Sequence, residues 1–81
     1  IASCRSGQGI SICANHQPDV ISILPYDDEG LLQARKHNCP NFITFASERW
    51  TPQNAYKAFK KAYMSAHFEG GRHSTRIQKF I

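Results

Sequence analysis

The chain has 81 residues, a length that accommodates one domain and leaves no room for two independent cores. Hydrophobic residues make up 41% of the chain and charged residues 20%, which is typical of a globular protein and excludes wholesale disorder. The apolar runs span only a few residues, which excludes a transmembrane helix, and no signal peptide is recognisable. We therefore expect one domain over residues 1–81.

Positive charge gathers in the second half of the chain. The formal net charge is +4, of which residues 1–40 carry −1 and residues 41–81 carry +5. A basic half of this kind favours a polyanionic partner, namely nucleic acid, an anionic membrane surface or an acidic protein. A solvated helix face is the alternative interpretation. The candidate anion-binding or nucleic-acid-binding residues are Lys57, Lys60, Lys61, Arg72, Arg76 and Lys79.

Three cysteines, Cys4, Cys13 and Cys39, are an odd number, so at least one thiol is free or joined to a second subunit. We expect one intramolecular disulfide among them, for example between Cys13 and Cys39. Two alternatives stay open, three reduced thiols or a tetrahedral zinc site formed by Cys13, Cys39 and two histidines, His16 and His37. We predict no metal and no other cofactor.

The first half of the chain shows one strong strand and one helix. Residues 1–9 are small and polar and indicate an irregular lead-in, and Gly7-Gln8-Gly9 lacks the third glycine of a dinucleotide-binding turn. Residues 10–13 alternate like a short edge strand, and the β-branched residues 20–24 predict a strand. Asp27 or Asp28 then caps a helix that runs to about His37.

The second half repeats the order of strand and helix. Residues 41–46 predict a strand, Thr51 caps the following helix, and Pro52 occupies its first position. This helix covers about residues 52–68 and ends at Gly70 and Gly71. Its apolar stripe consists of Ala55, Phe59, Ala62, Tyr63 and Ala66. Residues 74–81 alternate and predict a last strand.

This order of elements predicts an α+β fold. Each predicted helix lies between strands and carries one apolar stripe that must be buried. We therefore expect a two-layer α/β sandwich, in which two helices cover one face of a three- to four-stranded sheet.

A cluster of acid–base groups follows the second helix. Metal-free RNA cleavage needs a base, an acid and a cation at the phosphate, and histidine, glutamate and arginine supply them. The candidate catalytic residues are His67, Glu69, Arg72 and His73. The alternative is that His67 simply complements the dipole at the end of the helix, and that the others lie in a solvated loop.

Polar turns follow the two strong strands. They contain Tyr26, Asp27, Asp28, Ser47, Glu48, Arg49 and Trp50. If the strands are parallel, both turns lie at one edge of the sheet, where ligands of α/β proteins usually bind. Asp27 and Asp28 beside Glu48 would suit a divalent ion. Helix capping by the aspartates, with Trp50 as an apolar staple, is the alternative.

The pattern resembles small secreted fungal proteins, namely killer toxins and the ribonuclease-like effectors of plant pathogens. The likeness to killer toxins covers residues 20–81 in element order, and the likeness to the effectors rests on the helix TPQNAYKAFKKAYMSAHFEGG followed by a strand. It implies a small α/β sandwich cut from a precursor, consistent with the start at Ile1, and it assigns no catalytic residue.

These observations lead to a functional hypothesis with an alternative. The expected function is that of a secreted, non-enzymatic toxin- or effector-like domain that binds a protein or an anionic surface. A second subunit joined through the unpaired cysteine is among the expected partners. The alternative is a small nucleic-acid-binding protein or metal-independent ribonuclease that uses the basic half, and a cytoplasmic fragment is the other localisation considered.

Overall fold

Three short parallel strands form the centre of the computed structural model, which describes residues 1–79. The strands are β1 (Ala2–Cys4), β2 (Ser22–Ile23) and β3 (Phe42–Ala46), in the spatial order β1-β3-β2. β3 pairs with both neighbours, so that Ala2 lies opposite Thr44 and Ser22 lies opposite Phe42. The carboxyl ends of all three strands therefore lie at one edge of the sheet, which we call the carboxyl edge.

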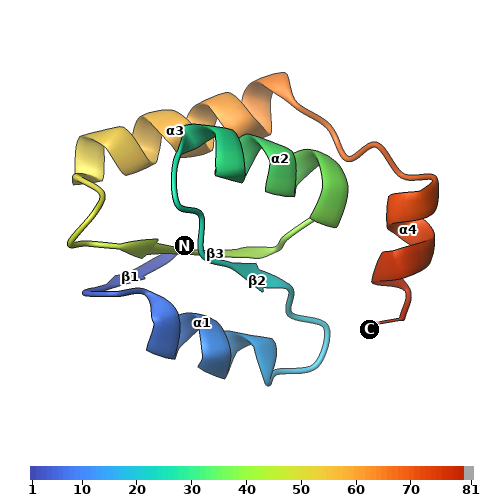
Figure 1. The fold of residues 1–81 in the computed structure, drawn as a ribbon, viewed down its shortest axis with the longest axis horizontal. Coiled ribbons are helices and arrows are strands. Elements are labelled where there is room, and N and C mark those ends of the chain that lie inside the picture. Colours follow the sequence, from blue (N-terminus) through green and yellow to red (C-terminus); the bar gives the residue numbers. More distant parts are fainter. Residues whose placement is uncertain (80–81) are drawn as a thin grey trace.

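Helices cover both faces of the sheet (Figure 1). α1 (Gln8–Asn15) lies on one face, whereas α2 (Asp28–Asn38) and α3 (Pro52–Ser65) lie together on the other. The short helix α4 (Arg72–Ile77) packs against α2 beyond the end of the sheet. The predicted small α/β fold, with a three-stranded sheet and two helices on one face, is confirmed, and α1 adds a layer that the sequence did not indicate.

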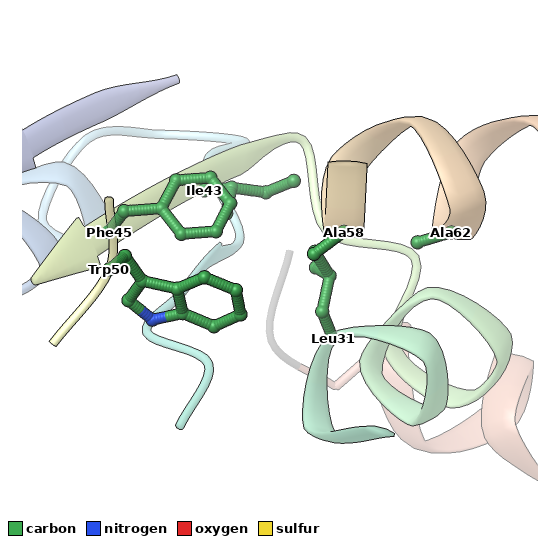
Figure 2. Close-up of a cluster of buried hydrophobic side chains, with 6 residues drawn as sticks. All are labelled: Leu31, Ile43, Phe45, Trp50, Ala58 and Ala62. Carbon is green, nitrogen blue, oxygen red and sulfur yellow. The ribbon is translucent and has the colours of Figure 1, made fainter. Parts of the chain in front are cut away.

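The main core lies between the sheet and the pair α2 and α3 (Figure 2). It consists of Leu31, Ile43, Phe45, Trp50, Ala58 and Ala62. The ring of Trp50 meets that of Phe45 edge to face, with centroids 5.0 Å apart, and its indole N–H donates to the carbonyl of Pro25 at 3.3 Å. Trp50 thereby ties the loop after β3 to the loop after β2, which positions both loops at the carboxyl edge.

Local signals for α2 and α3 are confirmed. The side chain of Asp27 accepts a hydrogen bond from the Gly30 amide at 2.7 Å, and that of Thr51 accepts one from the Asn54 amide at 3.1 Å. α3 ends earlier than predicted, at Ser65, because the chain becomes extended at Ala66. Gly70 and Gly71 do not end this helix, and Gly71 instead precedes α4.

Two predicted strands are wrong. Residues 10–13 belong to α1, where Ile10, Cys13 and Ala14 follow helical spacing, and the supposed lead-in contains β1. Residues 74–77 belong to α4, because His73 and Ile77 form its buried face at helical spacing. Residues 80 and 81, the end of that predicted strand, lie outside the described residues.

The cysteines do not form the predicted disulfide. Cys4 ends β1, Cys13 lies in α1 and Cys39 follows α2, and all three are free. Cys13 lies in α1 and Cys39 directly follows α2, and these two helices lie on opposite faces of the sheet. The same separation keeps apart the two halves of the zinc site that Cys13 and Cys39 would form with His16 and His37. Within residues 1–79, no helix is both long and apolar enough to cross a bilayer.

Candidate functional site

A turn between β1 and α1 forms the first part of a candidate site at the carboxyl edge. Cys4 is the last residue of β1 and is half-buried, and Gly7 adopts a left-handed conformation with φ of 78° immediately before α1. Gly7 has no side chain to cap the helix, so the first-turn amides keep free N–H groups for an oxygen ligand. The amide of Gln8 is the exception, since it donates a hydrogen bond to the Ser6 hydroxyl at 3.4 Å.

Glycine is required at position 7 for steric reasons as well. A Cβ atom there would lie 2.3 Å from Leu24 Cδ1 and 3.3 Å from the amide nitrogen of Ala46. The turn therefore sits directly on the ends of β2 and β3. This close approach brings the start of α1 to the carboxyl edge.

The loop after β3 forms the second part of the site. Its amides continue the sheet pairing, since Ser47 N donates to Cys4 O at 2.8 Å and Glu48 N donates to Arg5 O at 3.2 Å. The side chains of Arg5 and Glu48 form an exposed ion pair at 3.6 Å. The two loops are thus joined across the edge of the sheet through backbone and side chains.

Two open cavities lie at this edge. The first, which we call the edge cavity, has a volume of about 550 Å³. It is lined by Ser6, Gln8, Leu24, Pro25, Tyr26, Ala46, Glu48 and Arg49. A second, polar cavity is lined by Tyr26, Asp27, Asp28, Glu48, Arg49, Trp50, Asn54 and Lys57. The predicted meeting of the two polar turns is therefore observed.

The aspartates in the second cavity do not form the predicted ion site. Asp27 is engaged as the cap of α2, and the carboxylates of Asp27, Asp28 and Glu48 do not converge on a common point in the described residues. The capping interpretation of Asp27 is correct. Trp50 packs in the core, in contact with Phe45, rather than in a staple at the surface.

A second cluster lies at the other end of the molecule, between α2 and α4. The imidazole rings of His37 and His73 stack with centroids 4.3 Å apart and planes 13° from parallel. Glu69 Oε1 lies 3.6 Å from His37 Nε2 and 3.7 Å from His73 Nε2. Arg76 donates to the carbonyl of His37 at 2.7 Å and so closes the end of α2. We call these residues the histidine cluster.

One member of the histidine cluster, His73, has a perturbed pKa. Burial lowers the pKa of His73 below its ordinary value of 6.5, and repulsion from His37, Arg72 and Arg76 acts in the same direction, whereas Glu69 opposes it. His37, Glu69 and His73 bring one ligand atom each within 4.8 Å of one another. Parallel stacked rings direct their ring nitrogens side by side rather than towards one point, so this arrangement suits hydrogen bonding better than tetrahedral metal coordination.

The structure gathers some of the predicted site residues and separates others. Glu69, Arg72 and His73 lie together around the start of α4, whereas His67 is exposed in the preceding loop. Lys60 and Lys61 lie on the exposed face of α3, and Lys57 lines the cavity that contains the aspartates. Arg72, Arg76 and Lys79 belong to the region of α4, beyond the other end of the sheet (Figure 1). The candidate anion-binding residues therefore belong to two separate regions, α3 and the region of α4.

Sequence reasoning missed the turn from Cys4 to Gly9 and the part played by His37. The signal for the turn was present, because Gly7 directly precedes residues at helical spacing, Ile10, Cys13 and Ala14. The pairing of His37 with His73 carries no local signal, since the two residues come from different helices.

Comparison with known proteins decides the family. The family model described as Ribose/Galactose Isomerase matches residues 1–80. The chain belongs to this family. A probable ribose-5-phosphate isomerase B of Mycoplasma pneumoniae is 32% identical over 81 residues, which are all of this chain and 53% of that protein. The ribose-5-phosphate isomerase B of Escherichia coli is 32% identical over 96% of this chain and 52% of its own length.

Solved structures of the isomerase family agree with this assignment. The ribose 5-phosphate isomerase B of Anaplasma phagocytophilum superposes with a TM-score of 0.87 at 32% identity, over 98% of this chain and 54% of that one. The enzyme of Mycoplasma genitalium with bound ribulose-5-phosphate gives a TM-score of 0.88 at 32% identity, over 98% and 51% of the two chains. The chain spans about half the length of the relatives that it matches.

Membership of the isomerase family corrects the functional hypotheses drawn from the sequence. The resemblance to fungal killer toxins and ribonuclease-like effectors is wrong, because it rested on element order and basic charge, which many small α/β proteins share. The expectation of a non-enzymatic protein is wrong, since the relatives are isomerases. The expected partners, namely a protein, an anionic surface and RNA, are wrong as well, and so is the expected secretion.

Proposed function

We propose that this chain forms part of a sugar phosphate isomerase that interconverts ribose 5-phosphate and ribulose 5-phosphate at the carboxyl edge. The observation that supports this most strongly is the turn after β1, which leads from the half-buried Cys4 to the uncapped start of α1. The relatives, which are named for this reaction, align with nearly the whole chain, including this turn.

The reaction needs one base and a set of hydrogen-bond donors. Aldose-to-ketose conversion moves one proton from the second carbon to the first, and the hydroxyl proton of the second carbon to the carbonyl oxygen of the first. Atoms balance without any oxidant or reductant. The intermediate is an enediolate, whose negative oxygen is stabilised by fixed N–H donors.

Two groups at the carboxyl edge can accept the proton, Cys4 and Glu48. Glu48 is exposed and is paired with Arg5. Cys4 is half-buried and lines an apolar hollow of about 540 Å³ with Ile10, Cys13 and Phe42. Because Cys4 is less exposed than Glu48 and is not engaged in an ion pair, we assign the proton transfer to Cys4.

The first turn of α1 supplies the donors in this proposal. Its free amides and the hydroxyl of Ser6 are placed at the edge cavity, and Gly7 allows a ligand to approach the backbone closely. These fixed dipoles do not need to reorient as charge develops on the enediolate, which lowers the barrier.

Turnover of ribose 5-phosphate by the chain and by matched cysteine variants tests this proposal. We expect Cys4→Ala to abolish formation of ribulose 5-phosphate, and Cys39→Ala, at the exposed residue that follows α2, to retain it. Equal turnover in the Cys4→Ala variant and the unmodified chain would contradict the assignment of Cys4, and absence of turnover in the unmodified chain would contradict isomerisation by these residues alone. A galactose phosphate serves as the comparison substrate, because the family description also names galactose.

A further inference from the structure

The outer side of β1 is a free side of the sheet. Within the described residues β1 pairs with β3 alone, so its other side offers backbone N–H and C=O groups to a further strand. Ile1 directly precedes β1 and is 70% exposed. The side of β1 away from β3 is therefore open to a partner.

Two apolar hollows adjoin β1. The larger, of about 360 Å³, is lined by residues that include Ile1, Phe45, Trp50 and Phe59, and the smaller, of about 230 Å³, by residues that include Ile1, Phe59 and Tyr63. Since Ile1 and Phe59 line both hollows, the hollows form one surface, which we call the apolar face. None of the charged side chains in the described part of the chain lines this face, although the chain has 10 basic and 6 acidic residues. A surface of this composition is typical of a protein interface.

One cation, Arg35 in α2, lies beside the apolar face. Its guanidinium carbon is 4.4 Å from the centroid of the Tyr63 ring, in a cation–π contact. The Tyr63 ring is stacked on that of Phe59, with centroids 4.8 Å apart, and its hydroxyl donates to the carbonyl oxygen of Pro40 at 3.0 Å. The guanidinium therefore lies over a ring that is itself fixed in the apolar face.

Arg35 lacks the partner that a buried cationic donor needs. Its Nε is buried without a hydrogen-bond partner, and no carboxylate of the described residues lies within 4.0 Å of an Arg35 nitrogen. The dipole of α2 favours a positive charge in the last turn but supplies no acceptor for this N–H group. An unpartnered donor of this kind costs free energy, and a carboxylate would satisfy it through two parallel hydrogen bonds of the guanidinium fork.

We propose that the apolar face binds an extended apolar segment of the remaining half of the isomerase, and that a carboxylate of this segment pairs with Arg35. This chain aligns with 53% of the Mycoplasma pneumoniae relative and 54% of the Anaplasma phagocytophilum structure, so those proteins have a further half of similar size. Addition of a strand to β1 supplies main-chain hydrogen bonds, and the hollows take its apolar side chains. The inference rests on the proposed function for the choice of this partner.

A second copy of this chain is the competing occupant of the apolar face. Pairing of β1 with β1 of another copy would bring residues 1–5 of that copy to the face. This stretch contains no acidic residue and one basic residue, Arg5. Such a pair would leave Arg35 without a carboxylate and place another cation nearby, so the charges favour the remaining half of the isomerase.

Co-production of this chain with the half of the Escherichia coli ribose-5-phosphate isomerase B that it does not match tests the inference, with the affinity of the complex measured by analytical ultracentrifugation. We expect Arg35→Gln to weaken the complex by about tenfold or more, the range for a lost charge-assisted hydrogen bond. Urea unfolding of the free variant should be nearly unchanged, because Nε has no partner to lose there. Arg35→Lys should weaken the complex by a smaller factor, since it keeps the charge without the fork. Lys60→Gln, on the exposed face of α3, removes a positive charge elsewhere and should bind as the unmodified chain does.

A second pair of variants tests the apolar part of the face. Ile1→Lys should weaken the complex, because it would bury a charge between the two hollows and the added segment. Met64→Lys introduces the same charge on α3 at a residue that is 74% exposed and lines neither hollow, so its affinity should be unchanged.

The outcomes separate this inference from the proposed function, because formation of the complex is measured without substrate. A complex that depends on Arg35 but does not isomerise ribose 5-phosphate would support the inference and contradict the proposed function. Isomerisation by a complex whose affinity is unchanged in Arg35→Gln would do the reverse. Absence of a complex with the unmodified chain, an equal loss of stability in the free Arg35→Gln chain, or self-association of the chain that is lost in Ile1→Lys would each overturn the inference.

Discussion

His37 and His73 stack face to face with ring centroids 4.3 Å apart, although one lies in the last turn of α2 and the other in the first turn of α4. This contact, with Glu69 beside both rings, attaches α4 to the rest of the fold. The ring of His73 is largely buried, which disfavours its protonated form.

The lowered pKa of His73 makes stability depend on pH. In the unfolded chain His73 takes up a proton near its ordinary pKa of 6.5, whereas in the folded chain it does so only at lower pH. Below about pH 6.5 the unfolded state therefore binds more protons, and the free energy of unfolding decreases as the pH falls. Chemical unfolding between pH 5 and pH 8 measures this trend.

Two variants test whether His73, rather than another histidine, causes this pH dependence. In His73→Gln the free energy of unfolding should decrease less as the pH falls below 6.5. In His67→Gln, at an exposed position, it should decrease as much as in the unmodified chain. Identical pH profiles for His73→Gln and the unmodified chain would show that His73 does not titrate in this way.

Gly7 and Gly9 offer a matched pair of substitutions in one turn. Gly7→Ala places a methyl group 2.3 Å from Leu24 Cδ1 at a φ of 78°, so we expect a loss of about 2–5 kcal/mol in the free energy of unfolding. Gly9 lies in α1 with nothing within 4 Å of a Cβ atom, so Gly9→Ala should stabilise the chain by about 0.5–1 kcal/mol. Urea unfolding of both variants tests the geometry of the turn, and equal effects would contradict it.

Thr44 carries a hydroxyl for which the fold provides no partner. The residue is fully buried in β3 and its Oγ1 has no hydrogen-bond partner, which costs free energy in the folded state. Thr44→Val keeps the shape and should stabilise the chain by about 1 kcal/mol. Thr51→Val removes the cap of α3 and should cost about 1 kcal/mol, so the same change has opposite signs at the two sites. A destabilised Thr44→Val variant would show that the hydroxyl is satisfied in solution.

Features that depend only on neighbouring residues in the sequence were predicted correctly. The caps Asp27 and Thr51, the β-branched strand residues and the apolar stripe of α3 are properties of adjacent residues, and the structure confirms them. The helices α1 and α4 were missed because short segments such as residues 10–13 fit both a strand and a helix period. Packing against the sheet selects the helical conformation for α1, and contact with α2 selects it for α4.

The candidate site was predictable only in part. The meeting of the turns after β2 and β3 followed from parallel strands, whose carboxyl ends share one edge. The contribution of Cys4 to Gly9 depends on the pairing of β1 with β3, a contact between residues about forty positions apart that no local pattern encodes. For the same reason the sequence did not place Arg49 on the ring of Tyr26.

The claim that the carboxyl edge binds the sugar phosphate is tested most directly by ¹⁵N–¹H correlation spectra of the chain titrated with ribose 5-phosphate. The account predicts saturable shifts of the amides of Ser6, Gly7, Gln8 and Arg49, around the edge cavity. Shifts confined to α4 and the histidine cluster, or no saturable shifts at all, would contradict it.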